Sequence, residues 1–205
     1  MSHPKLRAAC AVRSLAIAVA ALSLAGCQGG QDKDKEKDWF DGGPMQLASP
    51  DTMQLTARVL AAKGKTEQAG FLIERMYQKY PDNLGTYSEG AEVLLIEGRI
   101  TDAIEWINRG LVRFPDNPVL LNNRGLCHLL DANLVAADKD FRGAYTKDPS
   151  DADYVSNLAL TRALSGDEKE ARRLWERVLP QSDVDANMKL AIAARPKFSK
   201  SAEHQ

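Results

Sequence analysis

The sequence has few of the residues on which catalytic and metal sites usually depend. It contains three histidines and three cysteines among 205 residues, and they are not grouped at the spacing of a metal site. A glycine-rich phosphate loop and a Gly-x-Ser-x-Gly turn are also missing. Only His128 lies within a predicted helix, at a position that packs between helices. We therefore predict that the chain is not an enzyme and uses no metal, cofactor or small-molecule substrate.

An excess of positive charge is lacking as well. The 27 lysines and arginines are balanced by 28 aspartates and glutamates, which gives a net charge of −1. Residues 1–26 hold three basic residues and no acidic one, so the remainder carries a net charge of −4. Nucleic-acid binding needs a clustered basic face, and aromatic residues interleaved with lysine and arginine are also absent. We predict no nucleic-acid partner.

Residues 1–26 have the pattern of an export signal. A basic segment precedes the apolar stretch Leu15–Ala25, which is too short to span a bilayer. The stretch ends in Leu24-Ala25-Gly26-Cys27, a motif that resembles the bacterial lipoprotein signal. The resemblance implies that residues 1–26 are removed and that Cys27 is the lipid-attachment site, with two or more acyl chains that anchor the protein stably. A short anchor helix with a coincidental cysteine is the alternative.

The cysteines do not form a disulfide framework. Cys10 lies in the signal and Cys27 is the predicted acylation site, which leaves Cys127 without a partner in the chain. Because Cys127 falls where a small apolar residue is expected in the middle of a helix, we predict a buried core thiol.

Residues 27–48 are predicted to tether the folded part of the chain to the membrane. The segment 28–43, QGGQDKDKEKDWFDGG, is rich in glycine and then in charges of alternating sign, and it cannot bury enough apolar surface to order itself. A calcium loop of the EF-hand type would need glycine where the chain has Lys37. The pair Trp39-Phe40 interrupts the polar run and is a candidate to dock on the folded domain or on a partner.

The rest of the chain repeats at one fixed spacing, which is the separation in sequence between Ala69 and Ala103. We call this spacing the repeat step. A fixed period of this length indicates an array of identical helical units. Small residues allow two helices to cross closely, glycine allows the turn between them, and proline closes each unit because it cannot continue a helix. The residues that keep the repeat step are Ala69, Ala103, Ala137 and Ala171; Ala57, Ala91, Gly125 and Ala159; Gly64, Gly98, Ala132 and Gly166; Ile73, Ile107, Phe141 and Trp175; and Pro81, Pro115 and Pro149. This pattern identifies tetratricopeptide repeats.

The repeat predicts an all-α fold, a right-handed α-solenoid of four helix-turn-helix units with a C-terminal capping helix. The repeat domain should cover residues 49–194, with a disordered tail at 195–205. The predicted units are 50–83, 84–117, 118–151 and 152–185, with the cap at 184–194. Their helices are expected at 50–62 and 66–79, 85–97 and 100–113, 118–131 and 134–147, and 152–165 and 168–179.

The first helices of the units should line the concave side of the solenoid and form a peptide-binding groove. The candidate groove residues on these helices are Arg58, Asn122, Asn123, Leu126, Asn157 and Leu160. An asparagine amide both donates and accepts hydrogen bonds, so a row of them can hold an extended peptide backbone. The alternative is that these asparagines belong to the scaffold.

Two features limit what this groove can bind. Arg58 is the one cation at such a position, with Glu89 and Glu92 beside it, which argues against a ligand that offers a free C-terminal carboxylate. The leucines of the third and fourth units predict a floor for apolar side chains or for a helix. Equally, the chain's own capping helix could cover them.

The segment NNRGLCHLLDANLVAADKDFRGAYTKDPSDADYVSNLALTRALSGDEKEARRLWERVLPQSDVDANM resembles the TadD-type lipoproteins of the tight-adherence (Tad/Flp) pilus system. The resemblance covers roughly residues 84–194 and the lipoprotein motif. It implies a pilotin-like factor whose protein partner is an outer-membrane secretin or another pilus-assembly component. Gln28 follows Cys27, where the common sorting rule retains lipoproteins with aspartate, so the expected location is the periplasmic face of the outer membrane.

Two other classes of interaction protein stay open. One is a tetratricopeptide lipoprotein of another outer-membrane machine, such as a type IV pilus pilotin or a barrel-assembly accessory. The other is an adaptor for periplasmic hydrolases. Neighbouring genes for a secretin and a pilus ATPase would favour the Tad/Flp interpretation over both.

Overall fold

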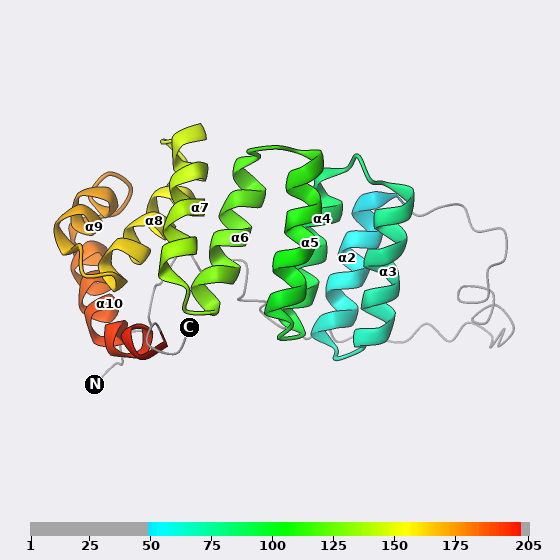
Figure 1. Cartoon of the computed structure of the whole chain (residues 1–205), viewed down its shortest axis with the longest axis horizontal. Coiled ribbons are helices and arrows are strands. Elements are labelled where there is room, and N and C mark those ends of the chain that lie inside the picture. Colours follow the sequence, from blue (N-terminus) through cyan, green and yellow to red (C-terminus); the bar gives the residue numbers. More distant parts are fainter. Residues whose placement is uncertain (1–48, 202–205) are drawn as a thin grey trace, which may run out of the picture.

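The described part of the chain, residues 49–201, is a row of nine α-helices without a β-strand in this computed structural model (Figure 1). The helices are α2 (Pro50–Ala62), α3 (Thr66–Lys79), α4 (Leu84–Ile96), α5 (Ile100–Arg113), α6 (Pro118–Leu130), α7 (Leu134–Lys147), α8 (Ala152–Leu164), α9 (Glu168–Trp175) and α10 (Gln181–Ser201). Four helix pairs, α2–α3 to α8–α9, follow one another along the row, and α10 closes it. The predicted all-α solenoid of four tetratricopeptide units with a C-terminal helix is confirmed. The predicted signal, Cys27 and the tether lie outside the described residues.

A polar capping side chain followed by proline starts α2 and α6, the first helices of the first and third units. Ser49 caps α2, since its Oγ accepts a hydrogen bond from the Thr52 amide, and Pro50 occupies the first turn. Asn117 caps α6 in the same way, with Oδ1 3.0 Å from the Val119 amide nitrogen. Residues that satisfy the free amides of the first turn thus fix where these helices begin.

The turns between the two helices of each unit need a left-handed backbone conformation. Gly64, Gly98 and Gly166 have φ angles of 72°, 73° and 96°. The fourth equivalent residue, Ala132, has a φ of 58°. An L-residue is strained in this region, whereas glycine is not.

We therefore expect Ala132→Gly to raise the free energy of unfolding by about 0.5–1 kcal/mol, because relief of the strain exceeds the entropic cost of glycine in the unfolded chain. Urea unfolding would measure the change. The matched control is Ala186→Gly within α10, on an exposed side of the helix, which should lose about 1 kcal/mol. A loss of stability in both variants would contradict the strained turn.

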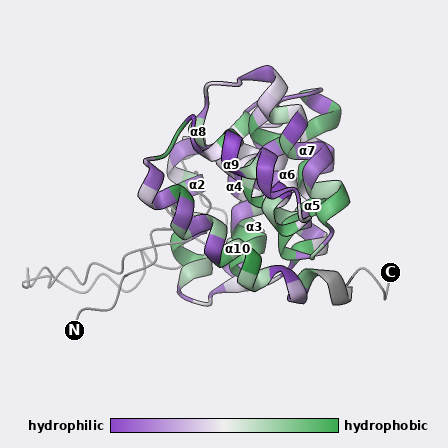
Figure 2. Cartoon of the chain, turned by 90° about the vertical axis from the view of Figure 1, so that its left-hand side faces the viewer, coloured by the Kyte–Doolittle hydropathy of each residue, from purple (hydrophilic) through white to green (hydrophobic). Residues whose placement is uncertain are grey.

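Small residues lie where the two helices of a unit cross. Ala103 and Ala137 are completely buried, as the period predicts. At Gly125 a β-carbon would come within 2.7 Å of the Phe141 ring, so the glycine is required by the close approach of α6 and α7. Seen from the α9–α10 end of the row, the ribbon alternates between hydrophobic and hydrophilic stretches, as expected for helices that bury one side (Figure 2).

The C-terminal end differs from the prediction. Helix α9 ends at Trp175, and α10 extends from Gln181 to Ser201 instead of covering only 184–194. The prediction of a disordered tail is therefore wrong for residues 195–201. The polar sequence of this segment suggested disorder, but tertiary contacts hold it: Arg195 donates from Nη2 to the Ala163 carbonyl at 2.8 Å, and Phe198 packs against the apolar core.

Candidate protein-binding surface

The first helices of the four units, α2, α4, α6 and α8, lie next to one another in sequence order. We call the side of the row that they form the first-helix surface, which is the concave side in a solenoid of this class. All the candidate groove residues lie on these helices. Some of them are accessible at this surface, and others form contacts between units.

Arg58 is already bound by acidic neighbours. Its guanidinium forms an ion pair with Glu89 of α4, and its Nε lies 3.5 Å from a carboxylate oxygen of Glu92. Burial raises the pKa of the Glu92 carboxyl to about 7. The positive charge of Arg58 offsets this rise only in part, and the nearby Glu89 adds to it. Arg58 therefore joins α2 to α4, which agrees with the prediction that this surface does not clamp a carboxylate.

The asparagines divide into two groups. The Asn157 side chain donates from Nδ2 to Oδ1 of Asn122 at 2.8 Å, and the two residues are 2% and 8% exposed. Asn157 and Asn122 therefore hold α8 to α6, and the expectation that they face a ligand is wrong. Asn123 is only half-buried. The scaffold interpretation is confirmed for Asn122 and Asn157, while Asn123 stays a candidate contact.

Leu126 and Leu160 are also partly used by the scaffold. Both are half-buried against an apolar cluster that includes Val184 and Met188 of α10. Helix α10 packs more extensively against α8 than against α9, so it covers the part of the first-helix surface that belongs to the fourth unit. For Leu160 of the fourth unit, coverage by the capping helix is the alternative that the structure supports.

Apolar side chains remain accessible beyond the reach of α10. Leu130 at the end of α6 is 56% exposed, and Ile96, its equivalent one repeat step earlier, is half-buried at the end of α4. Together with Asn123 they define the open part of the first-helix surface, over α4 and α6. Ile96 and Leu130 are one repeat step apart, so they occupy equivalent positions in the second and third units.

A polar cluster around the buried Asp140, which the sequence analysis did not identify, connects the second and third units. Asp140 of α7 accepts two hydrogen bonds from Arg124 of α6, both at 2.7 Å, and Arg124 also donates to Asn108 of α5 at 2.7 Å. The signal was present in the repeat, because Arg124 and Asp140 stand where the fourth unit has Leu158 and Leu174. Two opposite charges at apolar positions of one unit indicate a buried pair.

His128 and Cys127 lie close to this cluster. The His128 Nε2 is 3.8 Å from Asp140, and burial lowers the pKa of the imidazole. Cys127 is fully buried, and burial raises the pKa of its thiol to about 12. The predicted core thiol is confirmed, and His128 has the packed position expected of a structural histidine.

A cleft opens on the opposite side of the row, between α3 and α5. It has a volume of about 310 Å³, and its lining includes Ile73, Trp106 and Arg109. The Arg109 guanidinium lies over the Trp106 ring at 5.4 Å and over the Tyr77 ring at 5.7 Å. Charges of both signs line this cleft, so it favours no particular class of ligand.

The fold is similar to solved tetratricopeptide-repeat structures. A thermophilic repeat protein of Thermus thermophilus, TTC0263, matches with a TM-score of 0.58 and 17% identity over 77% of this chain and 83% of its own. A repeat protein from Parabacteroides merdae ATCC 43184 gives 0.62 and 14% identity over 84% and 70% of the two chains. MamA from Desulfovibrio magneticus RS-1 gives 0.54 and 16% over 71% and 89%. At these identities the likeness establishes the fold alone.

No protein-family model and no curated protein matches the sequence. Among residues 49–201, none of the helices is long and apolar enough to cross a membrane. The same range contains no group of three or more histidine, cysteine, aspartate or glutamate residues placed to hold a metal ion. The class of the protein is that of a tetratricopeptide-repeat solenoid.

Proposed function

We propose that the chain is a membrane-anchored scaffold for protein–protein interaction, and specifically a pilotin-like factor that assists assembly or localisation of the secretin of a Tad/Flp pilus. The observation that carries the interaction is the open first-helix surface over α4 and α6. The resemblance of residues 84–194 to TadD-type lipoproteins supports the secretin as the partner. The lipoprotein motif at Cys27 supports an anchor on the periplasmic face of the outer membrane.

The partner contacts the open part of the first-helix surface. Leu130 and Ile96 present apolar surface that a partner's side chains would remove from water. Asn123 lies on the same helix as Leu130 and offers both donor and acceptor groups to an extended backbone. The fourth unit contributes less, because α10 covers it.

Replacing both Asn123 and Leu130 by alanine tests this proposal. We expect the affinity for the secretin to fall about thirtyfold to several hundredfold, since each change removes roughly 1–2 kcal/mol of contact energy. A titration of the purified secretin would measure the affinity, and circular dichroism would show that the variant is folded. Asn157→Ala is unsuitable as a binding test, because it would leave Asn122 buried without its partner.

Val135→Ala provides the matched control. Val135 is 83% exposed on α7, a second helix, so its truncation should leave binding unchanged. Wild-type affinity in a folded Asn123→Ala, Leu130→Ala variant would place the partner on another surface. A wild-type chain that does not bind the secretin at all would exclude the pilotin-like role.

A further inference from the structure

Two side chains on the outer side of α2 are exposed, whereas the equivalent side chains of α4 in the next unit are buried. Val59 is 43% exposed, whereas Val93, the same residue one repeat later, is 1% exposed. Thr52 is exposed and its equivalent Thr86 is completely buried. The preceding unit covers these positions on α4, and in residues 49–201 no helix precedes α2. The opposite end of the row is closed by α10 (Figure 1), so the uncovered end is the one at α2.

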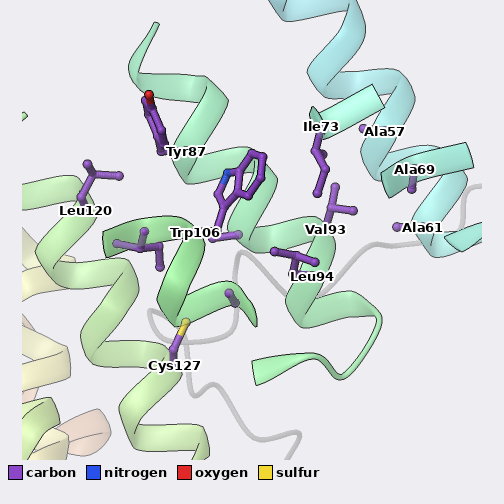
Figure 3. Packing of buried hydrophobic residues seen from close by; sticks show 13 residues of the cluster. Ala57, Ala61, Ala69, Ile73, Tyr87, Val93, Leu94, Trp106, Leu120 and Cys127 are labelled. Carbon is purple, nitrogen blue, oxygen red and sulfur yellow. The ribbon is translucent and has the colours of Figure 1, made fainter. Parts of the chain in front are cut away.

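The structure shows which residue covers Val93. Ile73 of α3 belongs to the same buried cluster as Val93, and the two side chains point toward each other (Figure 3). Ile73 occupies the large apolar position of the repeat, which Ile107, Phe141 and Trp175 fill in the later units. A residue at this position of one unit thus packs against the first helix of the next unit and covers it.

The repeat step, taken backwards from Ile73, reaches Trp39. Since Val59 lies one repeat step before Val93, the pair Trp39–Val59 is the counterpart of the pair Ile73–Val93. We propose that Trp39 folds back onto α2 and packs against Val59, so that the chain itself closes the first end of its array. An array of this kind needs both terminal faces covered, because each unit buries its apolar side only against a neighbour.

The connecting segment is long enough for this contact. Trp39 and Pro50 are eleven positions apart, and an extended chain of this length spans up to about 36 Å. Val59 lies only about 14 Å along α2 from Pro50. The Gly42-Gly43-Pro44 sequence supplies residues suited to reversing the chain direction.

Tryptophan fluorescence of the full chain in mild detergent tests the contact directly. The chain has three tryptophans, and Trp106 and Trp175 are only 7% and 2% exposed, so iodide can reach Trp39 alone unless it is covered. We expect little quenching in the wild type. Val59→Asn should release Trp39 and make the emission of one tryptophan of three accessible. If iodide already quenches one tryptophan in the wild type, and Trp39→Phe removes that component, the proposal is wrong.

Thermal unfolding provides a second readout. Trp39→Ala should lower the melting temperature by about 4–8 °C, as expected for the loss of one packed tryptophan. Combined with Val59→Asn it should lose less than the sum of the two single changes, because both remove the same contact. Val135→Asn, on an exposed site of α7, should be additive with Trp39→Ala.

Light scattering distinguishes a contact within one chain from a contact between two copies. A monomeric mass, with quenching independent of protein concentration, supports the proposal. A dimer that dissociates in the Val59→Asn variant would mean that a second copy covers α2, and strict additivity of Trp39→Ala with Val59→Asn would mean that the two residues do not touch. Either result overturns the proposal.

Discussion

Replacing Asp140 by alanine is expected to lower the free energy of unfolding by about 1.5–3 kcal/mol, the range for the loss of hydrogen bonds to a charged group, because the partly exposed Arg124 guanidinium is left without its carboxylate partner. The Asp140 side chain is 4% exposed, and the Arg124 side chain that it binds is 23% exposed. Without the carboxylate, the guanidinium would keep only its hydrogen bond to Asn108. Because Asn108, Arg124 and Asp140 belong to α5, α6 and α7, the loss should weaken the junction of the second and third units.

Urea unfolding would measure this effect, with Asp102→Ala as the matched control. Asp102 forms an exposed ion pair with Arg99, in which the side chains are 47% and 50% exposed, and such pairs contribute less than about 1 kcal/mol. A loss in Asp140→Ala no larger than in Asp102→Ala would contradict the importance of the buried pair.

A double replacement, Arg124→Leu with Asp140→Leu, distinguishes the effect of an unpaired charge from the effect of lost side-chain packing at this site. The fourth unit already has Leu158 and Leu174 at the equivalent positions. Apolar residues in place of a buried ion pair are often neutral or stabilising, since no charge is left without a partner. The double variant should therefore be much more stable than Asp140→Ala.

The sequence predicts the elements of this fold closely because the repeat step places the same physical requirements in every unit. Helices α2, α3, α5 and α7 have the predicted bounds, α6 and α8 end one residue earlier than predicted, and α4 is shifted by one residue at both ends. The buried crossing residues Ala103 and Ala137 follow from the same step. From the second helix of the fourth unit onwards the prediction becomes inaccurate, as α9 and α10 show.

The candidate site was predicted less well, because neighbouring units do not contact each other at equivalent positions. Asn122 bonds Asn157, which is 35 residues away, one more than the repeat step. Such a contact depends on how α6 and α8 cross, and the period does not specify that crossing. The coverage of Leu160 by α10 depends likewise on the direction of a helix that is not part of the repeat.

Replacing Cys27 by serine is expected to move the chain from the membrane fraction to the soluble fraction. Cys27 is the proposed attachment site, and acylation binds a membrane with about 0.8 kcal/mol per buried methylene group. Two or more acyl chains give stable anchoring, so the change should be close to all-or-none. Fractionation followed by mass spectrometry of the N-terminal peptide would detect both the anchor and the cleavage before residue 27.

Cys10→Ser is the matched control for this experiment, because Cys10 lies within the predicted signal and should be lost on cleavage. It should leave processing and membrane attachment unchanged. Cleavage of Cys27→Ser at the same place, with the product still in the membrane fraction, would exclude the lipid anchor. The released chain should still bind the secretin in solution, since Asn123 and Leu130 lie on α6 and do not depend on the anchor. Loss of secretin localisation in cells, with binding retained in solution, would then assign attachment to Cys27 and recognition to the first-helix surface.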